Sequence, residues 1–566
     1  MTRLWAIALT LLAGWLWYPA LFPAHVEGFS ASIESIARHL LGGDLQNFDR
    51  AYPFSAEFFM LSRLGMNLAA AGATLLAAGS SALGLRLLMI AGFALLVLSS
   101  LALVRHWTRS PATIVVLILL LLPGLGESAF FYNDNVLSAA LAAAALALAA
   151  RRSGFPAIIG AGALFGAAVL TRSDALLMAP ALALLLVERH GFSLALFIRL
   201  ALGLCMAALV ETGALLAFGV TPLDVMRTVT GTVDLWHRDL DLPRQLVQLL
   251  AFGGLPIGVL AAIGCIIVIR RRNGLRMALL IGVPALFLLV YWGKLWQARQ
   301  LLLLTPFVAC LAVEGLVALR TAIAGLRYQV VLWCGALLAF MVWPSTVWIT
   351  DGPHSVTGRL WSPLVWSQWQ QSVEFDFATL ASTVDTAGPG TSIIITDRWD
   401  ADRYLHLTLQ TAGYAMTPDM APGGCGLAVE PFTRGDRTIL HVRLHLPFLA
   451  ERLAALPALY QRYAAPCIAA VPAAPVRYLT NRLDAAAWLD GGAMPSLAGT
   501  PILPWLTAPA AVHLSVIDLD LARQRALQAF YRQIADTETG IAPVDTSSLA
   551  ELTARMAARS ALLKTP

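Results

Sequence analysis

The chain has 566 residues, of which 58% are hydrophobic and only 13% are charged. A soluble protein with this balance would expose large apolar patches, so the composition excludes an ordinary soluble globular protein and indicates a polytopic membrane protein. The formal net charge of +5 is weak evidence for nucleic acid, which we do not expect as a partner, because arginine clusters in a membrane protein first report topology.

Long apolar runs predict about eleven transmembrane helices. These runs lie at 4–22, 85–104, 112–125, 136–150, 157–170, 175–187, 194–218, 246–269, 277–292, 300–317 and 329–349. We interpret the first run as a retained helix, because it is long and tryptophan-rich and lacks a small-residue cleavage site. The stretch 57–84 is also apolar, but one more crossing would reverse every later loop. We therefore expect a helix or helix pair there, lying at or re-entering from the outer surface.

Basic residues set the orientation of these helices. With the N-terminus inside, the inner loops hold most of the loop arginines; these loops are 105–110, 151–154, 188–191, 270–276 and 319–327. Most loop carboxylates then fall outside. This distribution agrees with the positive-inside rule and predicts a cytoplasmic N-terminus.

After about residue 350 the long apolar runs stop, and Asp, Thr, Pro and Gly become frequent again. The sequence therefore predicts two domains, a transmembrane domain over 1–350 and an exported α/β domain over 351–566. Within the second domain, "GTSIIIT", "RTILHVRLHL" and "PCIAAVP" read as strands. Its two cysteines, Cys425 and Cys467, either form a disulfide or remain free thiols, since the sequence shows no geometry.

The first outer stretch, "VEGFSASIESIARHLLGGD", carries two glutamates of interest. Ile33, Ile36, Ala37 and Leu40 recur at helical spacing and predict an amphipathic surface helix that ends at Gly42-Gly43. Glu27 precedes this helix and is either a catalytic carboxylate or an acid favoured by the helix dipole. Glu34 lies four residues before Arg38, which favours a surface ion pair; the alternative role for Glu34 is contact with an acceptor sugar.

The stretch "FFYNDNVLSAAL" places Asp134 where an outward helix turns back. Asn133, Asp134 and Asn135 are all good helix caps, so a cap is the alternative to a functional carboxylate. Tyr132 fits an interfacial aromatic belt and is also a candidate for sugar contact.

Cations lie on the predicted outer side, where the positive-inside rule expects few. Arg172 stands in a very short turn and either pairs with Asp174 or holds an anion such as a lipid phosphate. Lys294 and Arg299 either snorkel beside nearby tryptophans or form an anion site. Trp236 and His237 belong to an outer loop that is either simply solvated or touches a sugar.

Together these residues predict a cavity that opens outward, with an acid or base at its mouth and an anion receptor at bilayer depth. The order of the motifs resembles the GT-C superfamily of membrane glycosyltransferases, which includes the lipid A aminoarabinose transferases and the protein O-mannosyltransferases. "VEGFSASIESIARHLLGGDLQNFDRAYPFSAEFF" is similar to the family's first acidic motif and tyrosine-proline segment, with Glu27 at the catalytic position. "FFYNDNVLSAAL", "LTRSDALL" and "WQARQLLLLTPF" resemble later motifs.

The chain also departs from the family pattern. Glu27 is followed by Gly28 rather than a second acid, and Gln300 stands where the family has tyrosine.

The resemblance implies a multi-pass enzyme of the bacterial inner membrane with a periplasmic C-terminal domain. Its donor would be a sugar on a polyprenyl phosphate, and its acceptor a glycan, a lipid or a protein. Glu27 would act as the base, and Asp134 would orient the acceptor. Arg172, Lys294 or Arg299 would stabilise the leaving lipid phosphate. Mg²⁺ or Mn²⁺ would suit carboxylate and phosphate oxygens, although the sequence shows no ligand cage.

Three other functions remain open at this stage. A transporter or flippase predicts internal repeats and charges within the spans, neither of which is evident. A lipid-linked polysaccharide polymerase or ligase predicts a large outer loop rich in Arg and His, whereas the loop 221–245 is moderate in size and mixed in charge. The third is a catalytically inactive relative whose exported domain binds a partner.

Overall fold

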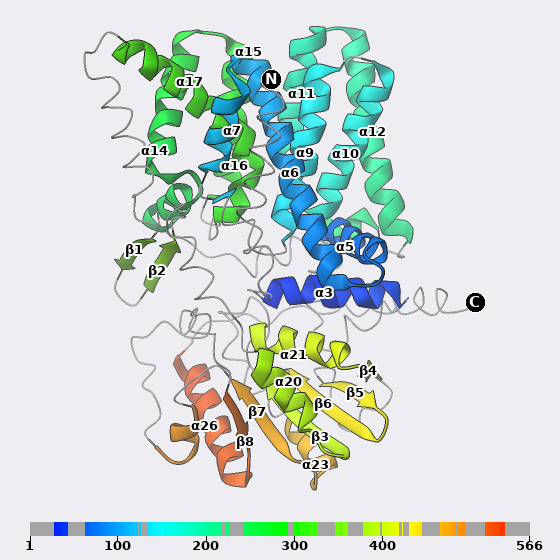
Figure 1. The fold of residues 1–566 in the computed structure, drawn as a ribbon. Coiled ribbons are helices and arrows are strands. Elements are labelled where there is room, and N and C mark those ends of the chain that lie inside the picture. Colours follow the sequence, from blue (N-terminus) through cyan, green and yellow to red (C-terminus); the bar gives the residue numbers. More distant parts are fainter. Residues whose placement is uncertain are drawn as a thin grey trace.

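The computed structural model describes parts of both the predicted transmembrane domain and the predicted exported domain. The described residues are 28–42, 63–122, 124–125, 133–152, 154–217, 221–226, 242–292, 298–324, 346–351, 354–359, 377–396, 399–417, 422, 429–443, 464–480, 485–492 and 515–537. The predicted spans at 4–22 and 329–349 lie outside them. Figure 1 shows a helical bundle and a smaller domain with a sheet, stacked end to end, with one helix crossing between them.

The helical part consists of mostly antiparallel neighbours joined by short turns. Its elements are α3 (Gly28–Leu41), α5 (Leu64–Leu76), α6 (Ser81–Thr108), α7 (Ala112–Leu120), α9 (Asp134–Arg151), α10 (Phe155–Thr171), η2 (Ser173–Met178), α11 (Ala179–His190), α12 (Leu194–Ala217), α14 (Leu242–Arg270), α15 (Gly274–Met277), η3 (Ala278–Gly282), α16 (Val283–Val290), η4 (Ala298–Leu304) and α17 (Thr305–Ile323).

Five helices of the described chain are long and apolar enough to cross a membrane. They cover Ser81–Thr108, Asp134–Arg151, Leu194–Ala217, Phe252–Arg270 and Arg299–Ile323, and shorter apolar helices lie beside them. The stretch 57–84 contributes α5 and the first turn of α6, which begins after the Ser80 cap. At 1.5 Å per residue, the 13 residues of α5 extend about 20 Å, too short for a hydrocarbon core of about 30 Å.

Small residues allow the membrane helices to approach closely. A Cβ atom on Gly264 of α14 would lie 1.9 Å from the Leu311 carbonyl oxygen of α17. A Cβ atom on Gly315 of α17 would likewise lie 1.9 Å from the Leu260 carbonyl oxygen. Backbone contact of this kind is how helices associate in lipid, where burial of apolar side chains gives little advantage.

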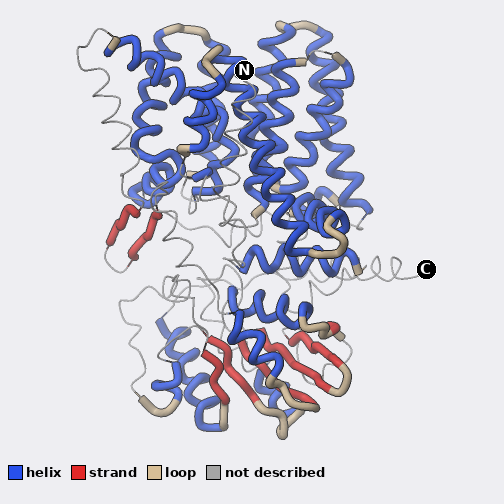
Figure 2. The backbone as a smooth tube through the Cα atoms, viewed as in Figure 1, coloured by secondary structure: helices blue, strands red, loops and turns tan. Residues whose placement is uncertain are grey.

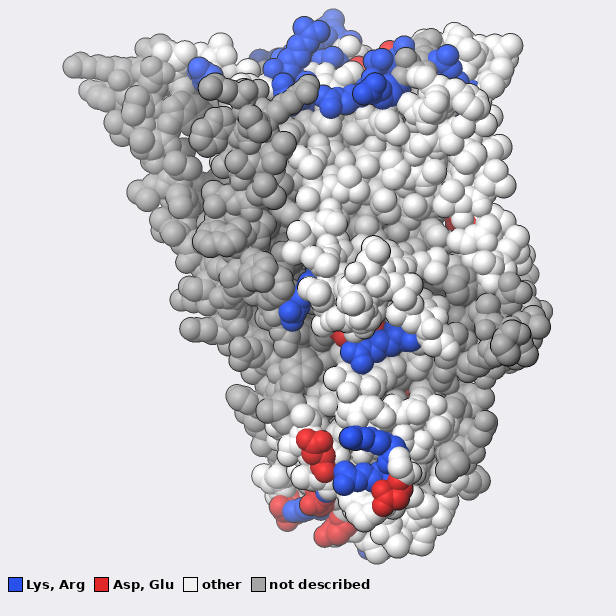
Figure 3. Space-filling view, turned by 45° about the vertical axis from the view of Figure 1, so that its right-hand side comes forward, with Lys and Arg blue, Asp and Glu red and all other residues white. Residues whose placement is uncertain are grey.

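The arginine-rich loops meet at the end of the bundle that is far from the sheet domain. Figure 3 shows a band of Lys and Arg along that end, above a nearly uncharged belt. Arg189 donates to the Ala150 carbonyl oxygen at 3.4 Å, and Arg276 lies 3.8 Å from Glu188. The loops that the sequence assigns to one side of the membrane are therefore neighbours in space.

The smaller domain is a three-layer α/β structure (Figure 2). Its strands are β3 (Gly390–Thr396), β4 (Ala415–Met416), β5 (Val429–Arg434), β6 (Arg437–Arg443), β7 (Val476–Thr480) and β8 (Ser515–Asp518), in the order β4-β5-β6-β3-β7-β8. Strand β3 is parallel to β6 and to β7, and the other pairs are antiparallel. A separate hairpin joins β1 (Thr346–Asp351) to β2 (His354–Arg359).

Helices cover both faces of this sheet. Successive isoleucines of β3 point to opposite sides, so each face presents apolar side chains that a helix can bury. Ile394 packs with α20 (Phe377–Asp385) and α21 (Trp399–Thr411), and Ile393 packs with α24 (Ala485–Leu489) and α26 (Leu521–Thr537). The strand predicted at "PCIAAVP" is wrong, since these residues form helix α23 (Ala465–Ala470). A short apolar run does not by itself distinguish a strand from a buried helix.

Helix α3 lies between the two parts of the molecule, with α5 on one side and α21 on the other (Figure 1). Its predicted apolar stripe is confirmed, because Ile33, Ile36 and Ala37 are buried in the core of the bundle. The helix ends just before Gly42, as expected.

Candidate active site

Helix ends position a group of charged side chains at the end of the bundle that faces α3. Asp134 is the first residue of α9, directly after Asn133, whose side chain accepts from the Val136 amide at 3.2 Å. Asn133 is thus the cap, and the Asp134 carboxylate is left to make other contacts. Arg172 ends α10 in an extended conformation, and Asp174 follows in η2.

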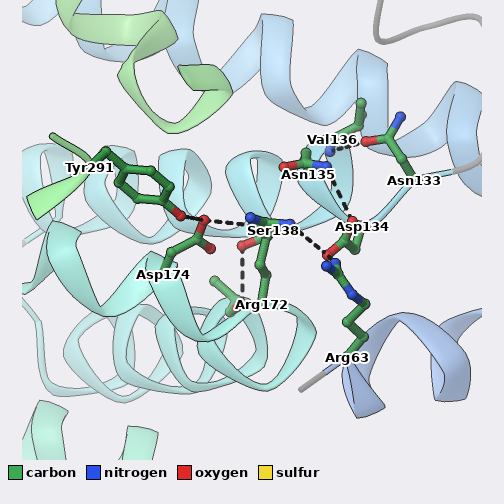
Figure 4. A network of polar contacts seen from close by, with 10 residues as sticks. Arg63, Asn133, Asp134, Asn135, Val136, Ser138, Arg172, Asp174 and Tyr291 are labelled. Carbon is green, nitrogen blue, oxygen red and sulfur yellow. Dashed lines mark hydrogen bonds and ion pairs between the residues drawn. The ribbon is translucent and has the colours of Figure 1, made fainter. Parts of the chain in front are cut away.

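These side chains form one continuous polar network (Figure 4). The Asp134 carboxylate pairs with Arg63 and lies 3.1 Å from Nη1 of Arg172. Arg172 also donates through Nε to Asp174 at 2.6 Å, and the Tyr291 hydroxyl donates to the same Asp174 oxygen at 2.5 Å.

Close backbone packing brings Arg63 to this place. Arg63 precedes α5, and the next glycine, Gly65, lies against the end of α10: a Cβ atom there would be 2.6 Å from the Thr171 nitrogen. A bond of 3.1 Å from the Ser138 hydroxyl to the Ala168 carbonyl oxygen joins α9 to α10. The ends of α5, α9 and α10 are therefore fixed relative to one another.

Among the described residues, this group holds more arginines than aspartates. Asp134 is fully buried, while the side chains of Arg63 and Arg172 are 11% and 15% exposed. Arg299, at the start of η4, also acts electrostatically on Asp134. Buried charges persist only where they are paired or functional, and the described part of this group holds three arginines and two aspartates.

The sequence-based predictions have mixed outcomes. The Arg172–Asp174 pair is confirmed. Glu34 pairs with Arg38 at 3.0 Å as predicted, but its carboxylate is buried, so the expected surface position is wrong. Glu34 also accepts from the Ser81 hydroxyl at 2.5 Å, so it ties α3 to the start of α6. Five predicted site residues lie outside the described residues: Glu27, Tyr132, Trp236, His237 and Lys294.

Glu27 nonetheless immediately precedes the first residue of α3. Helix α3 itself packs on both the bundle and the sheet domain.

Arg63 and Tyr291 belong to the network but were not among the predicted site residues. Both stand in stretches read mainly for their apolar character. An arginine in a stretch whose only other charge is Glu57 was the available signal for Arg63, because membrane-level charge is rare. Tyr291 gave no comparable signal.

The described residues hold no preformed cage for a divalent cation, although the buried Oδ1 of Asp174 has no hydrogen-bond partner among them. No group of three or more His, Cys, Asp or Glu side chains suited to a metal occurs among them. One Asp134 oxygen is bonded to the two arginines, and the other accepts from the side-chain nitrogen of Asn135 at 3.2 Å. We therefore derive no step through a metal.

Comparison with known proteins identifies the fold. No family model matches the chain, and no curated protein matches it. The oligosaccharyltransferase of Archaeoglobus fulgidus, solved with a tethered acceptor peptide, is 11% identical with a TM-score of 0.50, over 91% of this chain and 74% of that one.

Other solved structures are less similar to this chain. ArnT from Cupriavidus metallidurans, bound to undecaprenyl phosphate, is 17% identical with a TM-score of 0.42, over 60% of this chain and 63% of that one. Archaeal AglB from Archaeoglobus fulgidus, in complex with an inhibitory peptide and a dolichol-phosphate, is 12% identical with a TM-score of 0.44, over 72% and 64%. The chain thus spans less than two thirds of the length of ArnT.

The match to the archaeal oligosaccharyltransferase establishes a shared fold. The likeness concerns the fold alone, and it agrees with the resemblance to membrane glycosyltransferases drawn from the sequence motifs. The protein is a helical membrane protein of this architecture with a small mixed-sheet domain.

Proposed function

We propose that this protein is a membrane glycosyltransferase that moves a sugar from a polyprenyl-phosphate carrier to a glycan, lipid or protein acceptor, with inversion at the anomeric carbon. The observation that carries the proposal is the buried Arg63–Asp134–Arg172 group with Arg299 beside it, at the end of the bundle facing α3. A fold alone does not define an activity. A buried, arginine-rich site at one end of the bundle, in a fold shared with an oligosaccharyltransferase, supports this one.

The proposed topology has about eleven crossings, a cytoplasmic N-terminus, and a division into a membrane domain over 1–350 and a periplasmic domain over 351–566. The arginine-rich loops at the far end of the bundle support it, because such loops stay in the cytoplasm. The sheet domain and α3 then share the outer side of a bacterial inner membrane with the candidate active site.

The donor phosphate is assigned to the cations near η4. Arg299 and Lys294 flank the stretch 295–298, and Arg299 already acts on Asp134. Arg172 already donates to two carboxylates, those of Asp174 and Asp134. We therefore propose that it acts on the phosphate through its positive charge, and that it also holds the Asp134 side chain in position. These charges stabilise the leaving phosphate as the bond from the sugar breaks.

Glu27 is the proposed base. It takes the proton from the acceptor hydroxyl, whose oxygen forms a bond to the anomeric carbon while the bond to the phosphate oxygen breaks. The polyprenyl phosphate leaves with the electron pair. Asp134 orients the acceptor, and Tyr132, Trp236 and His237 contact the sugars. Glu34, buried against Ser81, holds α3 in place as well as lying near the acceptor.

Sugar transfer by the purified protein in nanodiscs tests the proposal. A panel of polyprenyl-phosphate sugars serves as donors, membrane extract as acceptor, and Glu27→Gln is compared with Asp436→Asn, which changes an exposed carboxylate in the β5–β6 turn. We expect transfer by wild type and Asp436→Asn and none by Glu27→Gln. Transfer by folded Glu27→Gln would refute Glu27 as base, and no transfer by wild type from any donor would refute the glycosyltransferase.

A further inference from the structure

A second buried polar network joins α3 to the sheet domain. Nε2 of His39, near the end of α3, lies 3.1 Å from Nε2 of His406 on α21. The side-chain nitrogen assigned to Gln410, one turn further along α21, lies 2.9 Å from the same His39 atom. His39 and His406 are 8% and 5% exposed, so this contact is shielded from water although it links residues 367 positions apart.

The network continues into the sheet behind His406. Nδ1 of His406 lies 2.8 Å from the Glu430 carboxylate on β5, and Nδ1 of His441 on β6 lies 3.5 Å from it. Nε2 of His441 lies 2.9 Å from the Thr396 hydroxyl on β3. Glu430, His441 and Thr396 are fully buried. This chain therefore runs from the surface that receives α3 to the central strand of the sheet.

The distances limit where protons can lie between the two histidines. With Glu430 as a carboxylate, Nδ1 of His406 is the donor to it, so one further proton between the two Nε2 atoms completes a hydrogen bond. Gln410 accommodates either direction of that bond, because its amide oxygen and nitrogen exchange places on rotation. A second proton would set two N–H groups and two positive charges face to face at 3.1 Å, and the bond would be lost.

We propose that His39 and His406 are positioning residues that latch α3 onto the C-terminal domain and that release it when both become protonated. Glu27 directly precedes α3, and Glu34 and Arg38 fix the opposite side of α3 through Ser81. The helix that leads out of the proposed base is thus held from both directions. The link to catalysis rests on the proposed function; the docking itself does not.

The pair has few other charged neighbours within the part of the chain that the structure describes. Glu430 and His441 face it from the sheet, and Gln410 faces it from α21. On α3, Glu34 and Arg38 are bonded to Ser81 at the start of α6. Helix α5 carries no titratable side chain. The side chains of Asp400, Asp402 and Arg403, also on α21, lie outside the described residues.

Hydrogen exchange measured by mass spectrometry tests docking without any sugar donor. Full-length protein in nanodiscs is compared at pH 8 and pH 5.5, after correction for intrinsic exchange. We expect α3 and α21 in wild type to exchange about threefold to tenfold faster at the lower pH, the range that loss of a net hydrogen bond gives. In His39→Gln and His406→Gln, the corrected exchange rates of α3 and α21 should not change between the two pH values. In His106→Gln, a change at the far end of α6, they should change as in wild type.

A kinetic measurement then separates positioning from general stability. Because the latch places the base without touching substrate, His39→Gln should lower kcat and leave only the acid limb that protonation of Glu27 gives, with donor KM unchanged. Unchanged exchange and an unchanged profile in both folded histidine variants would overturn the latch. Absence of transfer in every protein, with the exchange pattern as expected, would refute the proposed function and leave the docking contact established.

Discussion

At the scale of single residues, Asp134 is the centre of the candidate site, because two guanidinium groups depend on its charge. Replacing it with asparagine leaves Arg63 and Arg172 buried with less compensation. We expect Asp134→Asn to destabilise the protein by about 3–5 kcal/mol, the usual cost of removing one partner of a buried ion pair. The midpoint of thermal unfolding in detergent measures this.

A double variant provides the control for this prediction. Asp134→Asn combined with Arg63→Met should lose less stability than the sum of the single changes, because neither partner is then left without the other. Additive losses would show that the pair is not coupled.

Tyr291 makes a narrower contribution. Its hydroxyl donates to the Asp174 carboxylate at 2.5 Å, and bonds to charged acceptors contribute about 1.5–3 kcal/mol. Tyr291→Phe should lose that amount, measured by the same unfolding assay. Tyr414→Phe is the matched change, because the buried Tyr414 hydroxyl has no hydrogen-bond partner among the described residues, and it should leave stability unchanged. Equal losses in the two variants would contradict the assignment.

Sequence separation explains which contacts of the site could be predicted. Arg172 and Asp174 are two residues apart, and Glu34 and Arg38 are four apart, so local geometry indicates both pairs. Arg63 and Tyr291 reach the network across 71 and 117 residues. The packing of α5 against α10 and of α16 against η2 brings them there.

At the scale of elements, the close approach of α5 to α10 determines where Arg63 lies. Because a Cβ atom on Gly65 would meet the backbone and the hydroxyl of Thr171 at 2.6 Å, Gly65→Ala should force the two helices apart, at a cost of about 1–3 kcal/mol. Gly72→Ala on the same helix meets nothing within 4 Å and should be neutral or stabilising by up to about 1 kcal/mol. Thermal unfolding of both variants compares them, and equal behaviour would refute the close contact.

Apolar periodicity predicted the described membrane helices better than the small domain. Long runs such as 85–104 and 194–218 became α6 and α12, because a bilayer leaves the backbone few alternatives to a helix. In the sheet domain, "GTSIIIT" and "RTILHVR" are strands as expected, but the short run at 466–472 is mostly helix α23. Cys467 of this segment is buried in the core on one face of the sheet. That tertiary contact favours the helix, and the sequence alone does not reveal it.

At the scale of the whole molecule, the two parts meet through α3, which the sequence indicated only as an amphipathic helix. Its apolar stripe was readable because Ile33, Ile36 and Ala37 recur at helical spacing. Its polar contact with α21 was not, since His39 and His406 are 367 residues apart. Cys467 of the sheet domain is disulfide-bonded, and Cys425, with which the sequence suggested a bond, lies outside the described residues.

Membrane sidedness gives the last prediction, because the proposed chemistry requires the sheet domain and the arginine-rich loops to lie on opposite sides. Arg152 and Asp436 are both exposed, at the far end of the bundle and in the sheet domain. A membrane-impermeant maleimide, applied to cells with a permeabilised outer membrane, should label Asp436→Cys and leave Arg152→Cys unlabelled until the inner membrane is broken. The unsubstituted protein measures labelling of native thiols. Labelling of Arg152→Cys alone would show that the topology is the reverse of the proposed one. Helix α3, the Asp134 network and Glu27 would then belong to the cytoplasmic side.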